Sequence, residues 1–561
     1  MKSLFQLSIF LLMNIAPIFS QSNCPMKMGV NLYFNEYWSG EFPFSNLMLQ
    51  SSPKWIVRDI NNPEPDEWAS DKYHDSLTKD MNGYPIEIPQ TFKSQDEPQI
   101  AMSILFLDSN GPYPSGNYTL LYDGNGEINL FGGDVGSIIS KTTGRIVFKV
   151  NNNYQGVGIQ ITKSTKGNHI RNIRVLLPDT ENTIASHPFN PQFLKQLEPF
   201  SCIRFLNWGG VNNSTQNKWE DRNLPTYFTQ SSSSKGAVAY EYMIQLCNIL
   251  KKDMWICIPH AASADYRINL ATLLKNQLDP SLKIYLEYSN EVWNDIFEQH
   301  WYIKDNAPSD IVFHTHKYAY LANECFKSFE SIFGSSSNRL IRVLAGQHYN
   351  PWILEEAVAK MKEIGGKFDA LSVASYFAPI GLNGNLTVNE IAQQTKAEIA
   401  NHAKNHILSL SNLAKANNVP VVMYEGGPHM TKDQFGGLDQ PFVPALCQFH
   451  ESQQMYEIYN DWLHFLKDTA HVELNNILGF QDDICYFGHI KNLWDNNPTL
   501  KMKAVLDNIC KTVDNQYIDK IQGIVYPNPF LDNIYIQLPF NELSSIALRD
   551  INGQLIKNYQ S

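Results

Sequence analysis

The sequence predicts an α/β protein: a (β/α)8 TIM barrel that carries an inserted antiparallel β-sandwich and a short C-terminal β segment. From residue 188 onward, apolar strand-like runs alternate with longer helical patterns, whereas residues 60–178 have the composition and spacing of short antiparallel strands. A segment from residue 516 differs from both. We therefore expect a signal peptide at 1–22, the barrel at 23–59 plus 179–515, the sandwich at 60–178 and a separate C-terminal segment at 516–561.

The N-terminal residues have the pattern of a secretory signal peptide. Lys2 precedes an apolar run from Leu4 to Phe19, and cleavage is expected near Ser20. The run is too short and too often interrupted to span a bilayer, and no later segment has a bilayer-length apolar run. We expect an exported protein, secreted or at the cell surface. The remaining chain is long enough for two or three domains.

Eight apolar runs are the candidate barrel strands, and helical patterns separate most of them. The candidate strands are Met28–Phe34, Cys202–Trp208, Met254–Pro259, Lys283–Ser289, Leu340–Gly346, Ala370–Tyr376, Val419–Tyr424 and Ile477–Gln481. The candidate helices are Ala239–Leu250, Tyr266–Gln277, Ala319–Ile332, Pro351–Ile364 and Thr395–Ala416. In such barrels the chemistry gathers at the C-terminal ends of the strands.

The inserted segment is rich in Gly, Asn, Pro and Asp, and turn signals such as Asp123-Gly124 and Asn125-Gly126 separate its alternating runs. Those runs are Ile100–Leu107, Tyr118–Tyr122, Glu127–Phe131, Arg145–Val150, Gly156–Thr162 and Ile170–Leu177. We expect a sandwich of about six or more strands. It is either a carbohydrate-binding-like module or a structural wall of the cleft.

The composition of the chain limits the classes of molecule that it is expected to bind. A formal net charge of −12 argues against a nucleic acid or an anionic membrane surface and favours a neutral polymer as substrate. The eight cysteines could form disulfides in an exported protein, but they show neither paired spacing nor a zinc-type Cys/His cluster. His314 and His316 share a face only if the chain there is extended, so we expect no metal and no cofactor.

Two glutamates at the ends of predicted strands indicate the chemistry: Glu291 after Lys283–Ser289 and Glu425 after Val419–Tyr424. A carboxylate pair at strand C-termini is what hydrolysis of a glycosidic bond requires, since one group protonates the leaving oxygen while the other attacks or activates water. Asn-Glu alone is a weak signal because the chain has five such pairs, yet only Asn290-Glu291 closes a buried-strand pattern midway through the barrel. Glu287 is the rival acid, although its depth in the strand favours a structural partner for a buried basic residue.

Residues 200–430 resemble clan GH-A glycoside hydrolases, the retaining (β/α)8 enzymes that include glycoside hydrolase family 5. The resemblance implies that Glu291 is the general acid/base and Glu425 the nucleophile. It further implies that Asn290 binds the sugar 2-hydroxyl, that Arg204 keeps the nucleophile ionised and that Tyr376 orients it. His260 and His348 stand where subsite histidines occur in that clan, and the candidate stacking platforms for sugars are Trp208, Trp219, Trp293 and Trp301.

One position departs from the clan pattern. Members commonly carry a tryptophan at the end of strand eight, whereas this chain has Gly479-Phe-Gln-Asp-Asp-Ile-Cys-Tyr-Phe487, so Phe480 or Tyr486 is the candidate substitute. The predicted function is a retaining glycoside hydrolase that acts on a plant or algal polysaccharide. A non-catalytic glycan-binding protein on the same scaffold is the alternative, and transglycosylation would use the same residues.

The C-terminal segment resembles the sorting domain of type IX secretion found in Bacteroidetes, through Tyr526-Pro-Asn-Pro-Phe530 and the Asp550-Ile-Asn-Gly-Gln554 element. The resemblance implies the type IX secretion machinery as a partner. The later strands of that domain are not seen, so we expect an incomplete domain, which would mean either a fragment or impaired sorting. A small β appendage is the alternative reading.

Overall fold

The computed structural model describes residues 26–61, 74–92, 97–107, 113–184, 188–335, 337–433 and 436–509, together with the backbone of four short strands between residues 524 and 560. The chain divides into two compact units, of which the larger is Pro25–Ile509. The expected signal peptide lies outside the described residues.

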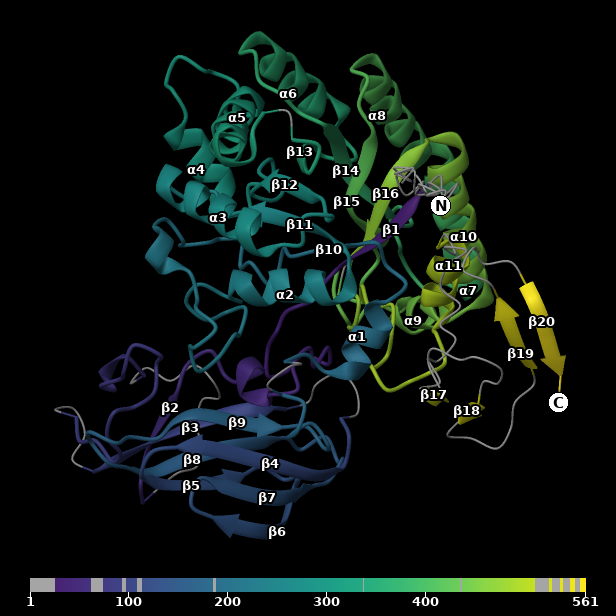
Figure 1. Cartoon of the computed structure of the whole chain (residues 1–561). Helices are drawn as coiled ribbons and strands as arrows, with labels where there is room; N and C mark the ends of the chain where they lie inside the picture. The colour runs from purple at the N-terminus through teal and green to yellow at the C-terminus, as the bar shows by residue number, and fades with distance from the viewer. Residues whose placement is uncertain are drawn as a thin grey trace, which may run out of the picture. The chain divides into compact units, whose positions relative to one another are not determined.

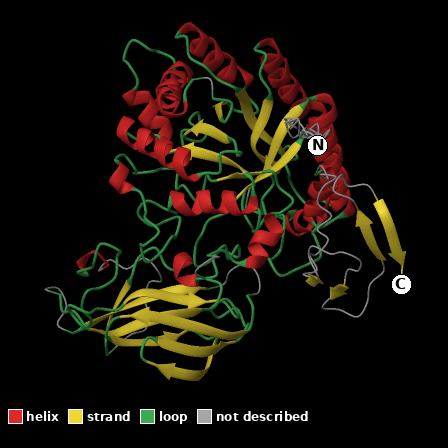
Figure 2. Ribbon diagram, in the orientation of Figure 1, coloured by secondary structure: helices red, strands yellow, loops and turns green. Residues whose placement is uncertain are grey.

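Eight parallel strands close into a barrel in the order β1-β10-β11-β12-β13-β14-β15-β16 (Figures 1 and 2), which confirms the predicted fold class. Their bounds are Lys27–Asn31 for β1, Cys202–Arg204 for β10, Asp253–Ile258 for β11, Ile284–Tyr288 for β12, Leu340–Ala345 for β13, Ala370–Phe377 for β14, Val421–Pro428 for β15 and Val472–Ile477 for β16.

The eighth strand lies earlier than predicted. We expected Ile477–Gln481, but β16 ends at Ile477. Two asparagines interrupt the apolar pattern of this strand, and both are buried and bonded: Asn475 Oδ1 accepts from Ser375 Oγ at 2.5 Å, and Asn476 Nδ2 donates to the Met423 carbonyl at 2.9 Å. Asparagine side chains that form hydrogen bonds can occupy a core, whereas asparagines in a sequence usually indicate a loop.

Helices flank the barrel strands (Figure 2). They are α1 Pro191–Leu197, α2 Tyr240–Leu250, α3 Ala264–Gln277, α4 Glu298–Asn306, α5 His314–Phe333, α6 Pro351–Glu363, α7 Val388–Glu398, α8 Lys404–Ala416, α9 Val443–His450, α10 Gln453–His464 and α11 Leu500–Asn508. The single helix expected at Thr395–Ala416 is two helices, α7 and α8, joined by a π-helical turn at Ile399–Ala403.

The longest helix, α5, shows why these segments are helical and where they pack. Its buried residues Tyr318, Ala322, Cys325 and Phe329 recur every three or four positions and form one apolar face. That face contacts β12 and β13, and α5 also packs against α3 and α6. Helix burial of this kind holds the strands in place around the barrel interior.

Side chains fill the interior of the barrel. Trp255 and Tyr285, from neighbouring strands, stack with ring centroids 5.3 Å apart, and Cys202, Val343 and Leu474 belong to the same buried cluster. The barrel interior is therefore a packed core, and the polar residues at the strand ends lie at one end of it.

Between β1 and β10 the chain forms a sandwich of two four-stranded antiparallel sheets, β2-β3-β8-β5 and β6-β7-β4-β9 (Figure 1). The strands are β2 Ile56–Asp59, β3 Gln99–Phe106, β4 Gly116–Asp123, β5 Gly126–Phe131, β6 Val135–Thr142, β7 Arg145–Val150, β8 Val157–Ser164 and β9 Arg171–Leu176.

Three details of the sandwich differ from expectation. β2 was expected in the barrel portion ending at residue 59, yet it pairs with β3. β6 was not predicted, because most of its side chains are exposed and it lacks the alternation of a half-buried strand. The turn signals at 123–126 join strands of different sheets, so they do not form a hairpin, since β4 pairs with β7 and β9 while β5 pairs with β8.

In the C-terminal segment, β17 (Ile524–Tyr526) pairs antiparallel with β18 (Tyr535–Gln537), and β19 (Ser545–Arg549) with β20 (Leu555–Gln560). These hairpins agree with the short β segment predicted there.

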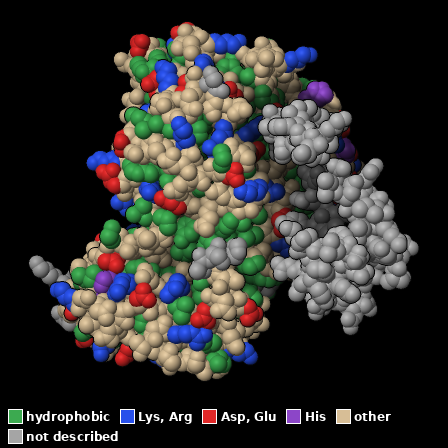
Figure 3. Space-filling model, viewed as in Figure 1, with side chains coloured by type: hydrophobic (Ala, Val, Ile, Leu, Met, Phe, Trp, Pro, Cys, Tyr) green, Lys and Arg blue, Asp and Glu red, His purple; other side chains and the backbone are tan. Residues whose placement is uncertain are grey.

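The described residues contain one disulfide, between Cys447 in α9 and Cys485 in the loop after β16. Sequence spacing did not reveal it. Cys202, Cys247, Cys257 and Cys325 are buried free thiols. No described helix combines the length and the apolar character needed to cross a membrane. Figure 3 shows basic and acidic side chains interspersed over the described part of the face that it displays.

Candidate active site

Arg204, the last residue of β10, is the centre of the polar cluster at the barrel mouth. Its side chain is fully buried. Nη1 donates to Glu425 Oε2 at 3.1 Å and to Asn31 Oδ1 at 2.9 Å, while Nη2 donates to Asn290 Oδ1 at 2.9 Å. Nε and Nη2 both contact Glu287 Oε2, at 3.1 and 2.8 Å. One planar, permanently charged group therefore fixes four side chains, which come from β1, from β12 and the turn after it, and from β15.

Glu287 is the buried partner of Arg204. Its Oε2 also accepts from Trp255 Nε1 at 2.7 Å, and its side chain is 1% exposed. Each of these contacts is a hydrogen bond donated to the carboxylate, from Arg204 or from Trp255. The structure thus places this residue in the structural role that its depth in the strand indicated.

Glu425 lies in β15 and receives two donors. Arg204 donates to Oε2, and the Tyr376 hydroxyl, from β14, donates to Oε1 at 2.8 Å. Pairing between β14 and β15 shifts here: Val373 pairs with Met423 but Ser375 pairs with Gly426, so β15 holds one extra residue. A bulge of this kind breaks the alternation of side chains. It explains how Tyr424 and Glu425, which are consecutive, both reach the same cluster.

Glu291 follows β12 in an unusual backbone conformation. Its φ is +40°, and Ser289 has a φ of +62°. Such left-handed conformations cost free energy for residues other than glycine and concentrate at functional sites. The Glu291 carboxylate accepts from the Tyr424 hydroxyl at 3.2 Å and from Asn294 Nδ2 at 3.3 Å. These bonds are longer than those to Glu425, and neither donor carries a charge.

Burial raises the pKa of both carboxyls. For Glu425, the Arg204 guanidinium opposes this rise in pKa, the negative charge of Glu291 adds to it, and the Tyr376 hydroxyl opposes it again. Because Arg204 and Tyr376 both hydrogen-bond Glu425, that carboxyl is the better stabilised anion of the two.

Asn290 links the catalytic cluster to a neighbouring loop. Its Oδ1 accepts from Arg204, while its Nδ2 donates to Asn212 Oδ1 at 3.1 Å. Gln299 Nε2, from α4, donates to the same Asn212 oxygen at 2.7 Å and to the Asn290 carbonyl at 2.9 Å. This network fixes the orientation of the Asn290 amide beside Glu291.

Trp208, predicted as a stacking platform, lies in the core. It is fully buried, and its ring stacks on Phe44 and Phe193 with centroids 5.7 and 6.3 Å apart. The residue was expected to end the strand Cys202–Trp208, but β10 ends at Arg204, and the Trp208 side chain points into the packing of the first helix. Trp208 is therefore no sugar platform.

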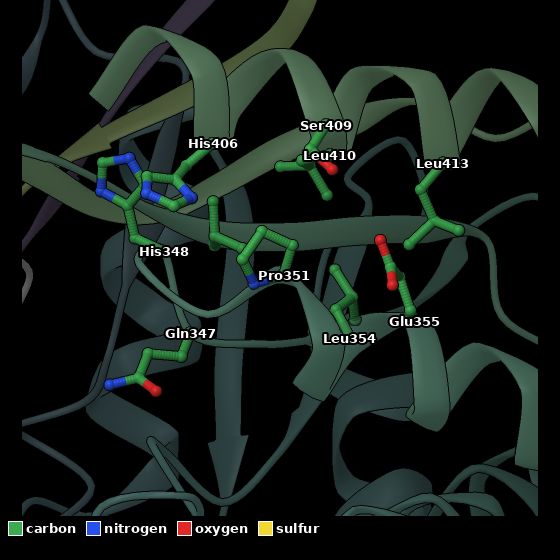
Figure 4. A pocket seen from close by; sticks show the side chains of 10 residues that line it. Gln347, His348, Pro351, Leu354, Glu355, His406, Ser409, Leu410 and Leu413 are labelled. Carbon is green, nitrogen blue, oxygen red and sulfur yellow. The ribbon is translucent and has the colours of Figure 1, made fainter. Parts of the chain in front are cut away.

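His348 was also expected at the substrate and instead lies between helices. Its Nε2 faces the Ala403 carbonyl at 3.4 Å, and its ring is 6.1 Å from that of His406 on α8. Figure 4 shows the two imidazoles side by side at one end of a pocket whose walls come from α6 and α8, with Leu354 and Leu410 along it. The residue belongs to the helix layer.

The four remaining aromatic and histidine candidates lie in different surroundings. Trp293 approaches the pair, with its ring 6.2 Å from that of Tyr424. His260 is 5% exposed, packs against Tyr302 with ring centroids 5.0 Å apart, and has its pKa lowered to about 4 by burial. Trp219 stacks on Tyr240, and Trp301 is 45% exposed on α4.

His314 and His316 point to different partners. The His314 ring stacks on His300, whereas His316 Nε2 contacts Glu356 Oε2 at 2.8 Å. Among the described residues, no group of three or more His, Cys, Asp or Glu side chains could hold a metal ion.

Sequence reasoning missed Asn31 and Tyr424. Asn31 ends β1, and its Nδ2 bridges to the carbonyls of Tyr424 and Ile477 at 3.0 and 3.1 Å. Asn31 carries a signal that could have identified it, since it is a polar residue closing a buried strand. Tyr424 carries none, because regular alternation would point it away from Glu425.

Neither Phe480 nor Tyr486 takes the place of the tryptophan that members of the clan carry at the end of strand eight. Phe480 is fully buried against Phe193 and Phe200, and the Tyr486 ring lies under Lys432 Nζ at 4.9 Å. From the same loop, the Phe487 ring lies 6.4 Å from that of Tyr376.

Comparison with known proteins gives one match in sequence. Residues 524–561 match the model of the secretion system C-terminal sorting domain, which confirms the resemblance of this segment and indicates an exported protein. No curated protein matches the sequence.

Solved structures that resemble this chain include three glycoside hydrolases. An arabinofuranosidase of family GH51 from Xanthomonas axonopodis pv. citri is 12% identical over 66% of this chain and 74% of its own, with a TM-score of 0.41. A thermostable GH51 alpha-L-arabinofuranosidase from Thermotoga petrophila is 14% identical over 66% and 71%, with a TM-score of 0.38. A modular endo-beta-1,4-mannanase from Cellulomonas fimi is 7% identical over 56% and 64%, with a TM-score of 0.35.

Proposed function

We propose that this protein is an exported retaining glycoside hydrolase that cleaves a plant or algal polysaccharide. The observation that carries the proposal is the unequal pair of buried carboxyls: Glu425 is held as an anion by Arg204 and Tyr376, and Glu291 has only uncharged donors. One ionised and one protonated carboxyl are what double displacement at a sugar requires.

In the first step, Glu425 attacks the anomeric carbon while Glu291 donates its proton to the departing glycosidic oxygen. The products are a glycosyl ester on Glu425 and a free alcohol. Forming the ester removes the negative charge of Glu425, so the pKa of Glu291 falls. In the second step Glu291 therefore takes a proton from water, the water oxygen attacks the anomeric carbon, and the Glu425 ester is cleaved.

The neighbours of the pair have supporting roles in this mechanism. We assign Asn290 the role of binding the sugar 2-hydroxyl. Its amide is oriented by Arg204, Asn212 and Gln299. Trp293 is the tryptophan best placed to contact the sugar. His260 is a candidate contact after β11.

We assign the sandwich the role of a wall that supports the barrel loops. The segment that leads into it bonds to the loop after β10, since Gln230 N donates to the Leu49 carbonyl at 2.7 Å and Thr229 Oγ1 to the Ser51 carbonyl at 2.9 Å. These contacts hold a loop of the barrel mouth in place.

The test is release of reducing sugar from arabinan, β-1,4-mannan, β-1,4-galactan, xylan, cellulose and polygalacturonate. Wild type should release sugar from at least one of the neutral polymers, and Glu425→Ala and Glu291→Ala should each remove nearly all of that activity. Glu363→Ala, at an exposed glutamate on α6, is the matched control and should retain full activity.

Binding of these polymers without any release would favour the glycan-binding alternative. Product analysis at high sugar concentration separates hydrolysis from transglycosylation, because transfer to a sugar acceptor lengthens the product while hydrolysis does not.

A further inference from the structure

A polar pocket of about 390 Å³ adjoins the catalytic cluster and takes no part in the proposed mechanism. Its walls are the loop after β10, residues 206–216, and the later part of the same connection, residues 232–237, with Phe34 beside them. Asn212 belongs to the lining and is also the side chain that bonds Asn290. The pocket therefore begins one hydrogen bond away from the residue assigned to the sugar 2-hydroxyl.

The lining consists mainly of uncharged hydroxyl and amide side chains. They are Asn207, Asn212, Asn213, Ser214, Thr215, Gln216, Ser232, Ser233 and Ser234, and the one charged side chain of the lining is the exposed Lys235. Such groups both donate and accept hydrogen bonds, as the hydroxyls of a sugar require. An anionic sugar would need more cationic partners than this lining offers.

A buried carboxylate braces one wall of the pocket. Glu36 is 1% exposed, and it accepts from Ser231 Oγ at 2.8 Å and from the Ser233 N–H at 2.7 Å. The neighbouring Asn35 exchanges two bonds with Ser232, each 3.0 Å long. Burying a carboxylate costs free energy unless it is hydrogen-bonded, so this brace defines the wall before any ligand arrives.

We propose that this pocket is a second sugar-binding subsite, which holds a neutral unit of the polysaccharide next to the unit at Glu291 and Glu425. The inference rests on the proposed function, because it takes the catalytic pair as the place where the adjoining unit sits. With this second subsite, the enzyme requires a chain of sugars as its substrate rather than a single sugar. Both the recognition of neutral units and the dependence on chain length follow from the lining and from the Asn212–Asn290 contact.

The test compares a variant that fills the pocket with a matched surface variant. Thr215 lines the pocket and is exposed, so Thr215→Trp places an indole in it. Thr272 is an exposed threonine on α3 outside the lining, and Thr272→Trp is the control. Binding is measured by isothermal titration calorimetry with oligosaccharides of two to six units made from arabinan, β-1,4-mannan, β-1,4-galactan, xylan and polygalacturonate, and turnover of the same probes is followed separately.

Wild type is expected to bind the neutral series more tightly as the chain grows, and Thr215→Trp to weaken the binding of tetra- to hexasaccharides at least tenfold, while Thr272→Trp binds as wild type does. Equal affinity of Thr215→Trp and wild type would overturn the subsite, and so would failure to bind any neutral oligosaccharide. Tighter binding of the polygalacturonate series would overturn its neutral character.

The two proposals fail in different ways. Binding that depends on Thr215 without any turnover would leave the subsite standing and contradict the hydrolase. Turnover that Thr215→Trp leaves unaltered at every chain length would leave the hydrolase standing and contradict the subsite.

Discussion

In the proposed mechanism, Arg204 favours the ionised form of Glu425 over that of Glu291. The guanidinium is buried among Glu287, Glu425, Asn31 and Asn290, and it reaches Glu425 but makes no described hydrogen bond to Glu291. Since both glutamates are buried, the proposal assigns their different roles to the two donors of Glu425, Arg204 and the Tyr376 hydroxyl. The difference between nucleophile and acid is thus a property of position and partner.

The Tyr376 hydroxyl should matter to catalysis through Glu425. Tyr376→Phe removes one hydrogen bond to a carboxylate, a loss of about 1.5–3 kcal/mol, so kcat/KM should fall roughly tenfold to a hundredfold. Steady-state kinetics on the preferred polysaccharide measure this. Tyr349→Phe is the matched control, because the Tyr349 hydroxyl donates to Glu398 at 2.5 Å in the helix layer. Equal kinetics of the two variants would argue against the role of Tyr376.

The alkaline limb of the pH profile should report Glu291. The protonated form is the active acid, and burial raises its pKa, so kcat/KM should decline as pH rises through that pKa. Asn294 Nδ2 stabilises the ionised form and lowers the pKa. Asn294→Ala should therefore move the alkaline limb to higher pH, while Asn405→Ala, at an exposed asparagine on α8, should leave it in place. A shift to lower pH would contradict the assignment of the acid.

Sequence alone located the catalytic candidates because strand ends in a barrel meet at one mouth. It could not give the direction of each side chain there. Trp208 and His348 both follow strands, yet one packs on Phe44 and the other lies against α8. Tyr424 was missed because regular alternation would point it away from Glu425, and only the extra residue in β15 brings the two together.

At the scale of elements, strands with continuous apolar runs were predictable and strands that carry polar residues were not. β11 to β15 lie close to their expected positions, whereas β16 contains two buried asparagines and β6 is largely exposed. In both cases a tertiary contact replaces the hydrophobic pattern: amide bonds within the barrel for β16, and pairing with β7 for β6.

The disulfide between α9 and the loop after β16 should stabilise the region next to the catalytic strands. Cys447 and Cys485 are 38 residues apart, and closing a loop of that size contributes about 3–4 kcal/mol. Cys447→Ser/Cys485→Ser should lower Tm, measured by calorimetry. Reductant should lower the Tm of wild type by more than it lowers the Tm of the double variant. A wild type that is insensitive to reductant would show that the bond contributes nothing.

At the scale of the whole molecule, the chain joins a barrel with a functional mouth to a segment that matches a secretion sorting domain. The two have separate functions in the proposal, since chemistry belongs to residues between 31 and 425 and export to residues 524–561. The sequence predicted this division through the resemblance of Tyr526-Pro-Asn-Pro-Phe530 and Asp550-Ile-Asn-Gly-Gln554 to the sorting domain.

Removing residues 524–561 should therefore reduce export without abolishing catalysis. In a host with the matching secretion system, less of the truncated protein than of the full chain should reach the surface or the medium, as an immunoblot of the fractions would show. Cell lysate should retain reducing-sugar release from the preferred polymer. Export of the truncated chain at the normal level would contradict the assignment of the tail.

Trapping the covalent intermediate tests the proposal most directly. Wild type incubated with the 2-deoxy-2-fluoro glycosyl fluoride of the sugar that it releases should gain the mass of one fluorinated sugar, because the fluorine slows the second step more than fluoride departure slows the first. Peptide mapping by mass spectrometry should place that sugar on Glu425, and Glu425→Ala should gain none. A label on Glu291, or inactivation without any label, would contradict the double displacement through Glu425.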